Sequence, residues 1–252
     1  MRALSRIFDL GGLDDVTVAY DYAQALLELD VGHATNHQLK PSSGDVVGIA
    51  MTPTVLRDGV LKSHIVLNAA FIESLDTPDS EGYPHSLHIL AHECAHVETS
   101  GRFDAAFPGT LRRLSVQNSR IAHRWNTFLA CWDEYSATRL SAGIGNDPTD
   151  DYENTFITTV CETRLRANAL IAAYRSHGNV DQILEEIYGA YGDLLKFSAY
   201  HLGNLDGAGI EVMAKPRTVE CPAGSLVHAV FHSAKGRLRK NSAGRRKVER
   251  PG

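Results

Sequence analysis

The sequence is poor in the features that mark secreted and membrane proteins. Its 252 residues include only four cysteines, which are widely scattered and form no C-x-x-C pair. This spacing argues against a disulfide framework and against a cysteine-rich zinc site. No apolar run approaches the roughly 18 residues of a membrane span, and residues 1–12 are too poor in apolar side chains for a secretory signal. We therefore expect a protein of the reducing cytoplasm with no membrane partner.

Positive charge is also scarce outside one segment. Residues 235–250 hold eight lysines and arginines and one glutamate, a local charge of +7. Because the whole chain carries −5, the remainder carries −12. An acidic body with a basic end is not typical of a general nucleic-acid-binding domain. Contacts of residues 235–250 with phosphate backbones or an acidic partner, and a solvated end without function, all stay open.

One short motif points to chemistry. Residues 92–96 read His-Glu-Cys-Ala-His and fit the H-E-x-x-H pattern of zinc-dependent hydrolases. On a helix, side chains four residues apart lie on one face, so His92 and His96 can bind the same metal ion. Glu93 lies beside them, where its carboxylate could accept a proton from a water molecule that zinc activates.

The rest of this predicted helix, about residues 85–99, agrees with the motif. Leu87, Leu90, Cys94 and Val97 form an apolar stripe roughly opposite the two histidines. The stripe predicts that the helix buries one side and presents the metal site on the other. The alternative is an amphipathic helix with solvated histidines.

A catalytic zinc site needs a third protein ligand. A histidine six residues after His96 is excluded, because Arg102 is found there and Thr99 replaces the glycine of that pattern. A glutamate from a later helix is the other common arrangement, and Glu134 is the best candidate. Its helical neighbours are small, which allows two helices to approach closely: Thr127, Ala130, Cys131, Ala137, Thr138 and Ser141.

Several more side chains are candidates for roles at the site. Asp133 and Glu162 are rival ligands, although Asp133 lies about 100° round the helix from Glu134 and could instead support a ligand histidine. His88 extends the histidine row by one turn and reads as a partly exposed residue rather than a fourth ligand. Three candidates to stabilise an oxyanion are better explained as structural residues: His123, Tyr135 and Arg139.

The remaining elements are predicted from periodicity and from turn residues. We expect strands at 46–51 and 62–68, joined through a turn at residues 57–59, and a short helix at 69–75. Helices are expected at 14–30, 111–141, 152–174 and 180–202. After Gly203 we expect irregular structure with a short element at 226–231, and a disordered tail from residue 233.

In combination, the H-E-x-x-H motif, the strand-like residues 65–68 before it and Glu134-Tyr135-Ser136-Ala137 after it resemble the ImmA/IrrE-type zinc metallopeptidases. The resemblance covers about residues 15–142. It implies a gluzincin-like site with His92, His96 and Glu134 as zinc ligands and Glu93 as catalytic base. It also implies a cytoplasmic bacterial or phage setting, in which relatives cleave or control repressor proteins.

The sequence departs from that family in three ways. Residues 97–133 make a long link between the two parts of the site, Ala95 replaces the usual glycine, and residues 150–250 have no counterpart. Repressor substrates are therefore not assumed for this chain.

The expected fold is α+β. A zincin-like metallopeptidase domain, residues 1–145, has a small sheet and the H-E-x-x-H helix. A helical extension, residues 146–232, packs on it, and a basic tail follows at 233–252. The expected function is zinc-dependent hydrolysis of a protein or peptide substrate, with Glu93 as general base. The alternatives are a regulatory or binding protein with a structural or inactive zinc site, and a factor associated with nucleic acid through residues 235–250.

Overall fold

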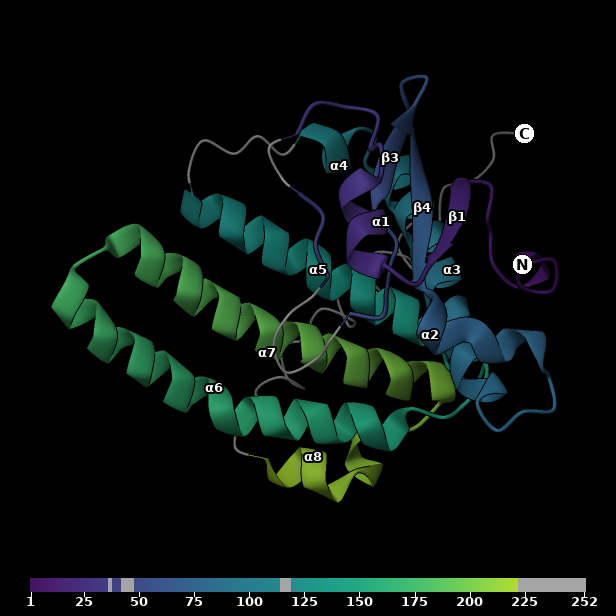
Figure 1. The fold of residues 1–252 in the computed structure, drawn as a ribbon. Coiled ribbons are helices and arrows are strands. Elements are labelled where there is room, and N and C mark those ends of the chain that lie inside the picture. The colour runs from purple at the N-terminus through teal and green to yellow at the C-terminus, as the bar shows by residue number, and fades with distance from the viewer. Residues whose placement is uncertain (36–37, 42–47, 114–118, 222–252) are drawn as a thin grey trace, which may run out of the picture.

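A computed structural model describes residues 1–35, 38–41, 48–113 and 119–221, and it has an α+β architecture (Figure 1). A small sheet forms in the first third of the chain, and long helices make up most of the rest. The strands are β1 Leu13–Ala19, β2 Ala50–Met51, β3 Thr54–Arg57 and β4 Val60–Asn68. The α-helices are α1 Tyr22–Glu28, α2 Ala69–Ile72, α3 Tyr83–Ala106, α4 Thr110–Arg113, α5 Ser119–Ser141, α6 Thr149–His177, α7 Val180–Ala208 and α8 Pro216–Glu220.

The sheet is mixed and is built around β4. Strand β1 pairs with one side of β4 in parallel, with Val16 opposite Ile65. Strands β2 and β3 follow one another along the other side of β4, and both run antiparallel to it. Thr52 and Pro53 lie in the break between β2 and β3. This break places Thr52 at the sheet edge near α3.

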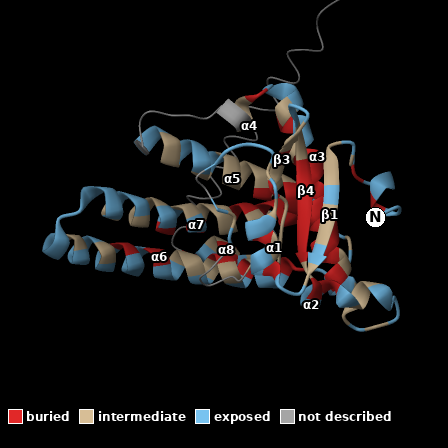
Figure 2. Ribbon diagram, turned by 45° about the horizontal axis from the view of Figure 1, so that its top comes forward, coloured by how far each residue is buried: buried red, intermediate tan, exposed pale blue. Residues whose placement is uncertain are grey.

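Alternate residues of β4 supply the two faces of the sheet. Ile65 and Leu67 belong to the main core, which they share with α3. Val66 points the other way and packs with Tyr22 and Leu26 of α1. Figure 2 shows that burial is concentrated in α3 and β4, whereas α6 is exposed over much of its length. Helix α3 therefore lies at the centre of the packing.

Helix α3 differs from the predicted helix in length and burial. It continues through Gly101 to Ala106, because a single glycine in a helix costs only about 1 kcal/mol. Its residues from His88 to Thr99 are all buried. The expectation that one face lies buried and the other open is therefore wrong. The side that carries the histidines is covered as well, by helices that come later in the chain.

Helix α7 packs directly against α5. A side chain at Gly203 would collide with the Oγ1 atom of Thr138 and the backbone of Tyr135, and one at Gly207 would collide with the backbone of Arg139. Both glycines therefore permit a close approach of the two helix backbones. Helix α6 runs beside α7 and is joined to it by a tight turn at Gly178 (Figure 1).

Most of the predicted elements are present, and the largest difference lies at residues 14–30. The predicted helix over residues 14–30 is wrong in its first half, because residues 13–19 form β1. The β-branched run Val16-Thr17-Val18 pairs with β4, and the helix begins only after Asp21, which accepts a hydrogen bond from the backbone N–H of Gln24. Helix α7 also continues beyond the predicted end, through Gly203 to Ala208.

Some predictions fall on residues outside those described. Of the strand predicted at 46–51, residues 46 and 47 lie outside the described ranges and residues 50–51 form β2. The predicted turn at 57–59 joins β4 to β3, a strand that was not predicted, rather than to residues 46–51. The element at 226–231 and the tail from residue 233 lie beyond residue 221. The division at residues 145 and 232 into domains stays a prediction. Within the described part of the chain, no helix is both long and apolar enough to cross a membrane.

Candidate metal centre

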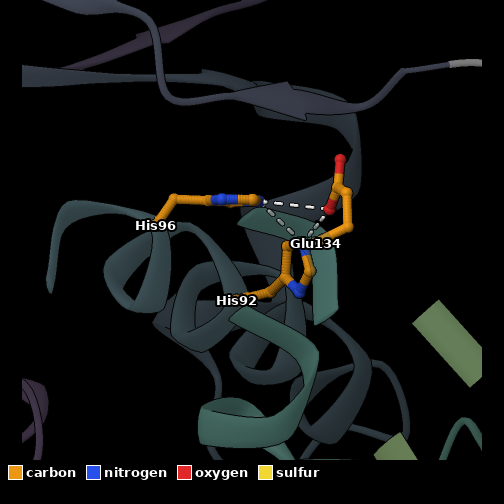
Figure 3. A group of neighbouring side chains, drawn as sticks. All are labelled: His92, His96 and Glu134. Atoms are coloured by element: carbon orange, nitrogen blue, oxygen red, sulfur yellow. Dashed lines mark hydrogen bonds and ion pairs between the residues drawn. The ribbon is translucent and has the colours of Figure 1, made fainter. Parts of the chain in front are cut away.

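Three buried side chains from two helices converge on one point (Figure 3). His92 and His96 project from one face of α3, and Glu134 reaches them from α5. Each of the three residues is 8% exposed. Three atoms that could bind a metal ion thus face one another in the interior: Nε2 of His92, Nε2 of His96 and Oε2 of Glu134.

The spacing of these atoms fits a single metal ion. The two Nε2 atoms are 3.0 Å apart, and Oε2 of Glu134 lies 3.3 Å from that of His92 and 3.4 Å from that of His96. Ligands about 2.0–2.1 Å from a tetrahedral zinc ion lie about 3.3 Å from one another. Oε2 is buried and makes no well-formed hydrogen bond with any described group. Two imidazoles and one carboxylate are also a common donor set for catalytic zinc.

The charges around these residues compensate one another. Burial alone would raise the pKa of Glu134, but His96, His92 and Lys196 outweigh it and hold that pKa well below its usual value. Burial alone would lower the pKa of His96, but Asp133 and Glu134 raise it well above its usual value. The carboxylate is therefore kept ionised in the interior, as a metal ligand must be.

Two ion pairs contact the candidate ligands. Asp133 places Oδ2 3.0 Å from Nδ1 of His96, an ion-pair contact with a poor angle for a hydrogen bond. Lys196 of α7 places Nζ 3.0 Å from Oε1 of Glu134. The contact of Asp133 agrees with the supporting role considered for it from the sequence, and its position behind His96 separates it from the three converging atoms.

Glu93 has a defined partner of its own. The hydroxyl of Thr52 donates a hydrogen bond of 2.6 Å to Oε2 of Glu93. Glu93 is 6% exposed and follows His92 directly on α3. The break between β2 and β3 therefore fixes the carboxylate that the motif assigns as general base.

His88 is a structural residue in this geometry. It is buried rather than partly exposed as expected, with Nδ1 3.0 Å from the carbonyl of Ile144 and Nε2 3.3 Å from the hydroxyl of Tyr152. Burial lowers the pKa of His88 to about 4, so the ring is neutral at pH 7. Both ring nitrogens are engaged away from the three converging atoms.

The rival ligand Glu162 and the three candidate oxyanion stabilisers lie apart from the convergent group. Glu162 is exposed on α6. His123 stacks on Tyr188, with ring centroids 5.1 Å apart. The Tyr135 hydroxyl donates to Asp206 at 2.8 Å, and Nε of Arg139 lies 2.9 Å from the same carboxylate. The last two residues therefore join α5 to α7.

Three residues near the centre were not expected from the sequence: Thr52, Lys196 and Tyr200. The ring of Tyr200 stacks on His92, with centroids 5.6 Å apart and planes inclined by 14°. Lys196 and Tyr200 are four apart on α7 and so share a face. That spacing was available in the sequence, but nothing in it indicated which helix the face would meet.

A cavity of about 250 Å³ adjoins the centre. Two of its lining residues contact the site directly, since Thr52 bonds to Glu93 and Asp133 pairs with His96. Its wall also includes apolar residues, among them Leu111, Leu129 and Trp132. The cavity thus offers space for a partly apolar group next to the candidate base.

Comparisons with protein-family models, with curated proteins and with solved structures find no match to this chain. The resemblance to ImmA/IrrE-type metallopeptidases therefore rests on the motif residues and their geometry. What the structure establishes is a buried group, His92, His96 and Glu134, that could hold a metal ion.

Proposed function

We propose that the protein is a zinc-dependent metallopeptidase of zincin-like architecture, similar to the ImmA/IrrE type. The observation that carries the proposal is the convergence of three buried donor atoms, no more than 3.4 Å apart, from His92, His96 and Glu134. A solvated amphipathic helix, the alternative considered for the motif, would not bury both histidines against a carboxylate from another helix.

His92, His96 and Glu134 would hold the ion. Zinc bound by such a donor set lowers the pKa of water to near 7 and polarises a carbonyl group. Glu93 accepts the proton as water attacks the peptide carbonyl carbon, and then passes that proton to the leaving amine nitrogen as the C–N bond breaks. The hydrogen bond from Thr52 keeps the Glu93 carboxylate oriented through both transfers.

The adjoining cavity favours a peptide as substrate. It is lined by Thr52, the hydrogen-bond partner of Glu93, and its lining combines polar residues with Leu129 and Trp132. One side chain of a bound peptide could occupy it while the neighbouring peptide bond lies near the base. Mixed apolar and polar linings are typical of sites that bind such groups.

The test is hydrolysis of a peptide library, read by mass spectrometry, with wild-type protein and Glu93→Gln. We expect the variant to keep one zinc per chain and to lose at least about 100-fold in hydrolysis, the usual contribution of a general base. Zinc-loaded wild type that cleaves nothing would contradict the peptidase proposal. It would favour the alternative of a regulatory or binding protein with a structural zinc site.

A role in nucleic-acid binding stays a prediction, because residues 235–250 lie outside the described part of the chain. A salt-dependent DNA-binding measurement on the full chain and on one lacking these residues tests it. Unchanged binding after the deletion would rule this role out.

A further inference from the structure

One face of α7 covers the candidate metal centre. Lys196 and Tyr200 lie one turn apart on this helix, and each contacts a proposed ligand. Both belong to the part of the chain, residues 150–250, for which the sequence suggested no role. The contact of Lys196 is the more specific, because it distinguishes the two oxygens of Glu134.

The two oxygens of Glu134 have different surroundings. Oε2 faces the histidine nitrogens, whereas Oε1 lies 3.0 Å from Nζ of Lys196. A carboxylate can bind a metal ion through one oxygen or through both. With Oε1 held by a lysine ammonium group, only Oε2 is free to bind an ion between His92 and His96.

Lys196 is itself held in place. Its ammonium group lies 5.8 Å from the centre of the Tyr200 ring, within the range of a cation–π contact. The Tyr200 ring is packed against His92 and also against Tyr152 of α6, at a centroid distance of 5.4 Å. The lysine is therefore fixed between a ligand carboxylate and an aromatic ring that touches a ligand histidine.

Tyr200 adds a second link between α7 and the centre. Nδ1 of His92 is buried and, within the described ranges, has no hydrogen-bond partner. A ligand histidine is usually oriented by a hydrogen bond from that second nitrogen. For His92 the stacked Tyr200 ring limits rotation instead, whereas His96 has Asp133.

We propose that Lys196 is a positioning residue that restricts Glu134 to a single metal-binding oxygen and so keeps one coordination position available for water and substrate. Helix α7 would then be an integral part of the metal centre. This inference rests on the proposed metallopeptidase function, since it concerns how the same site binds its ion.

The experiment uses Co²⁺ in place of zinc, because its visible absorption depends on the number of ligands. Lys196→Met removes the ammonium group beside Oε1, so the proposal predicts that this oxygen joins the coordination. We expect this variant to keep one Co²⁺ per chain but to absorb visible light less strongly than wild type, since Co²⁺ absorption weakens as the coordination number rises above four. Lys196→Arg, which keeps a cation beside Oε1, should retain the wild-type spectrum.

Lys215→Met is the matched control. Lys215 also pairs with a buried glutamate, Glu153, at 3.4 Å, but that pair lies between α6 and the segment before α8. We expect Lys215→Met to leave the cobalt spectrum unchanged. Thermal unfolding checks that each variant is folded. If Lys196→Met is not, Lys196→Gln takes its place, because it also removes the charge.

The outcomes separate the two proposals. Wild type that binds neither Zn²⁺ nor Co²⁺ would overturn the metal site and this inference together. If wild type binds Co²⁺ and Lys196→Met gives the same spectrum as wild type, only the role of Lys196 is overturned. A spectral change of the same size in Lys215→Met would also overturn it, because the effect would not be specific to the centre.

Discussion

At the scale of single residues, the Glu93 carboxylate depends on one hydroxyl group. Thr52 donates to its Oε2 atom at 2.6 Å, and the hydroxyl also lies 3.4 Å from the Glu93 backbone carbonyl. A base that must accept and then return a proton works best with its carboxylate held in one orientation. The strand break places Thr52 where its hydroxyl can hold the Glu93 carboxylate in the orientation that the proposed mechanism requires.

Thr52→Val tests this orientation, because it replaces the hydroxyl with a methyl group of similar size. We expect kcat to fall roughly 10-fold, as the loss of one hydrogen bond to a charged group costs about 1.5 kcal/mol. Zinc content should not change. Thr52→Ser should keep most of the activity, and equal rates for the Val and Ser variants would contradict the role.

The residues of the centre differ in how far the sequence predicts them. His92, Glu93 and His96 follow from helix geometry alone, because their spacing is local. Glu134 was found through the small residues around it. Thr52 bonds to Glu93, which is 41 positions away, and Lys196 pairs with Glu134, which is 196 − 134 = 62 positions away. Only the fold brings each residue to its partner.

At the scale of elements, the close contact of α5 and α7 places Lys196 beside Glu134 at the candidate metal centre. Gly203 lies at this contact, against Thr138 and the backbone of Tyr135. Small residues on α5 were expected from the sequence to allow a helix to approach. Thr138 does so for α7, while Ala137 packs in the core that contains α3.

Gly203→Ala should force the two helices apart. We expect the free energy of unfolding to fall by about 1–3 kcal/mol, the usual cost of overpacking. Gly189→Ala on the same helix is the matched control, because a methyl group there meets nothing within 4 Å. That substitution should stabilise the protein by up to about 1 kcal/mol. Urea unfolding measures both, and equal effects would contradict the contact.

The helix predicted at residues 14–30 is wrong at its start for a reason that concerns the pairing of elements. Val18, Tyr22, Ala25 and Leu26 recur at helical spacing, but Val18 is 53% exposed and lies in β1. Residues 13–19 form a strand because they pair with β4, some 50 positions later in the chain. Local periodicity cannot predict such a long-range pairing.

At the scale of the whole molecule, a buried polar network joins α6, α7 and α8. Thr218 donates its hydroxyl hydrogen to Glu153 at 2.7 Å, so Nε2 of His201, 2.9 Å away, is the donor of the hydrogen bond that the Thr218 oxygen accepts. Nδ1 of His201 is buried without a hydrogen-bond partner in the residues described. Burial lowers the pKa of His201 to about 4.

This network predicts acid sensitivity. Histidine in the unfolded chain has a pKa near 6.5, so between pH 6.5 and pH 4 the unfolded chain binds a proton at residue 201 that the native state does not bind. The free energy of unfolding should fall by about 3 kcal/mol between pH 6.5 and pH 4 from His201 alone, and this contribution should be constant above pH 6.5. His88, whose pKa is also about 4, adds to the loss.

Urea unfolding of metal-free protein across this pH range measures the effect. His201→Gln removes the titrating group, so its stability should decline less steeply between pH 6.5 and pH 4 than that of wild type. A variant with the wild-type slope would contradict the assignment. A chelator in every sample keeps metal binding from contributing to the slope.

His92, His96 and Glu134 are proposed to bind one zinc ion together, and the zinc content of the purified protein tests this binding most directly. Purified wild type is predicted to hold one zinc per chain, and His92→Ala and Glu134→Ala are predicted to hold almost none. His88→Gln, altered one turn from His92, should keep its zinc. Wild type without stoichiometric zinc, or Glu134→Ala that binds zinc as wild type does, would contradict the account.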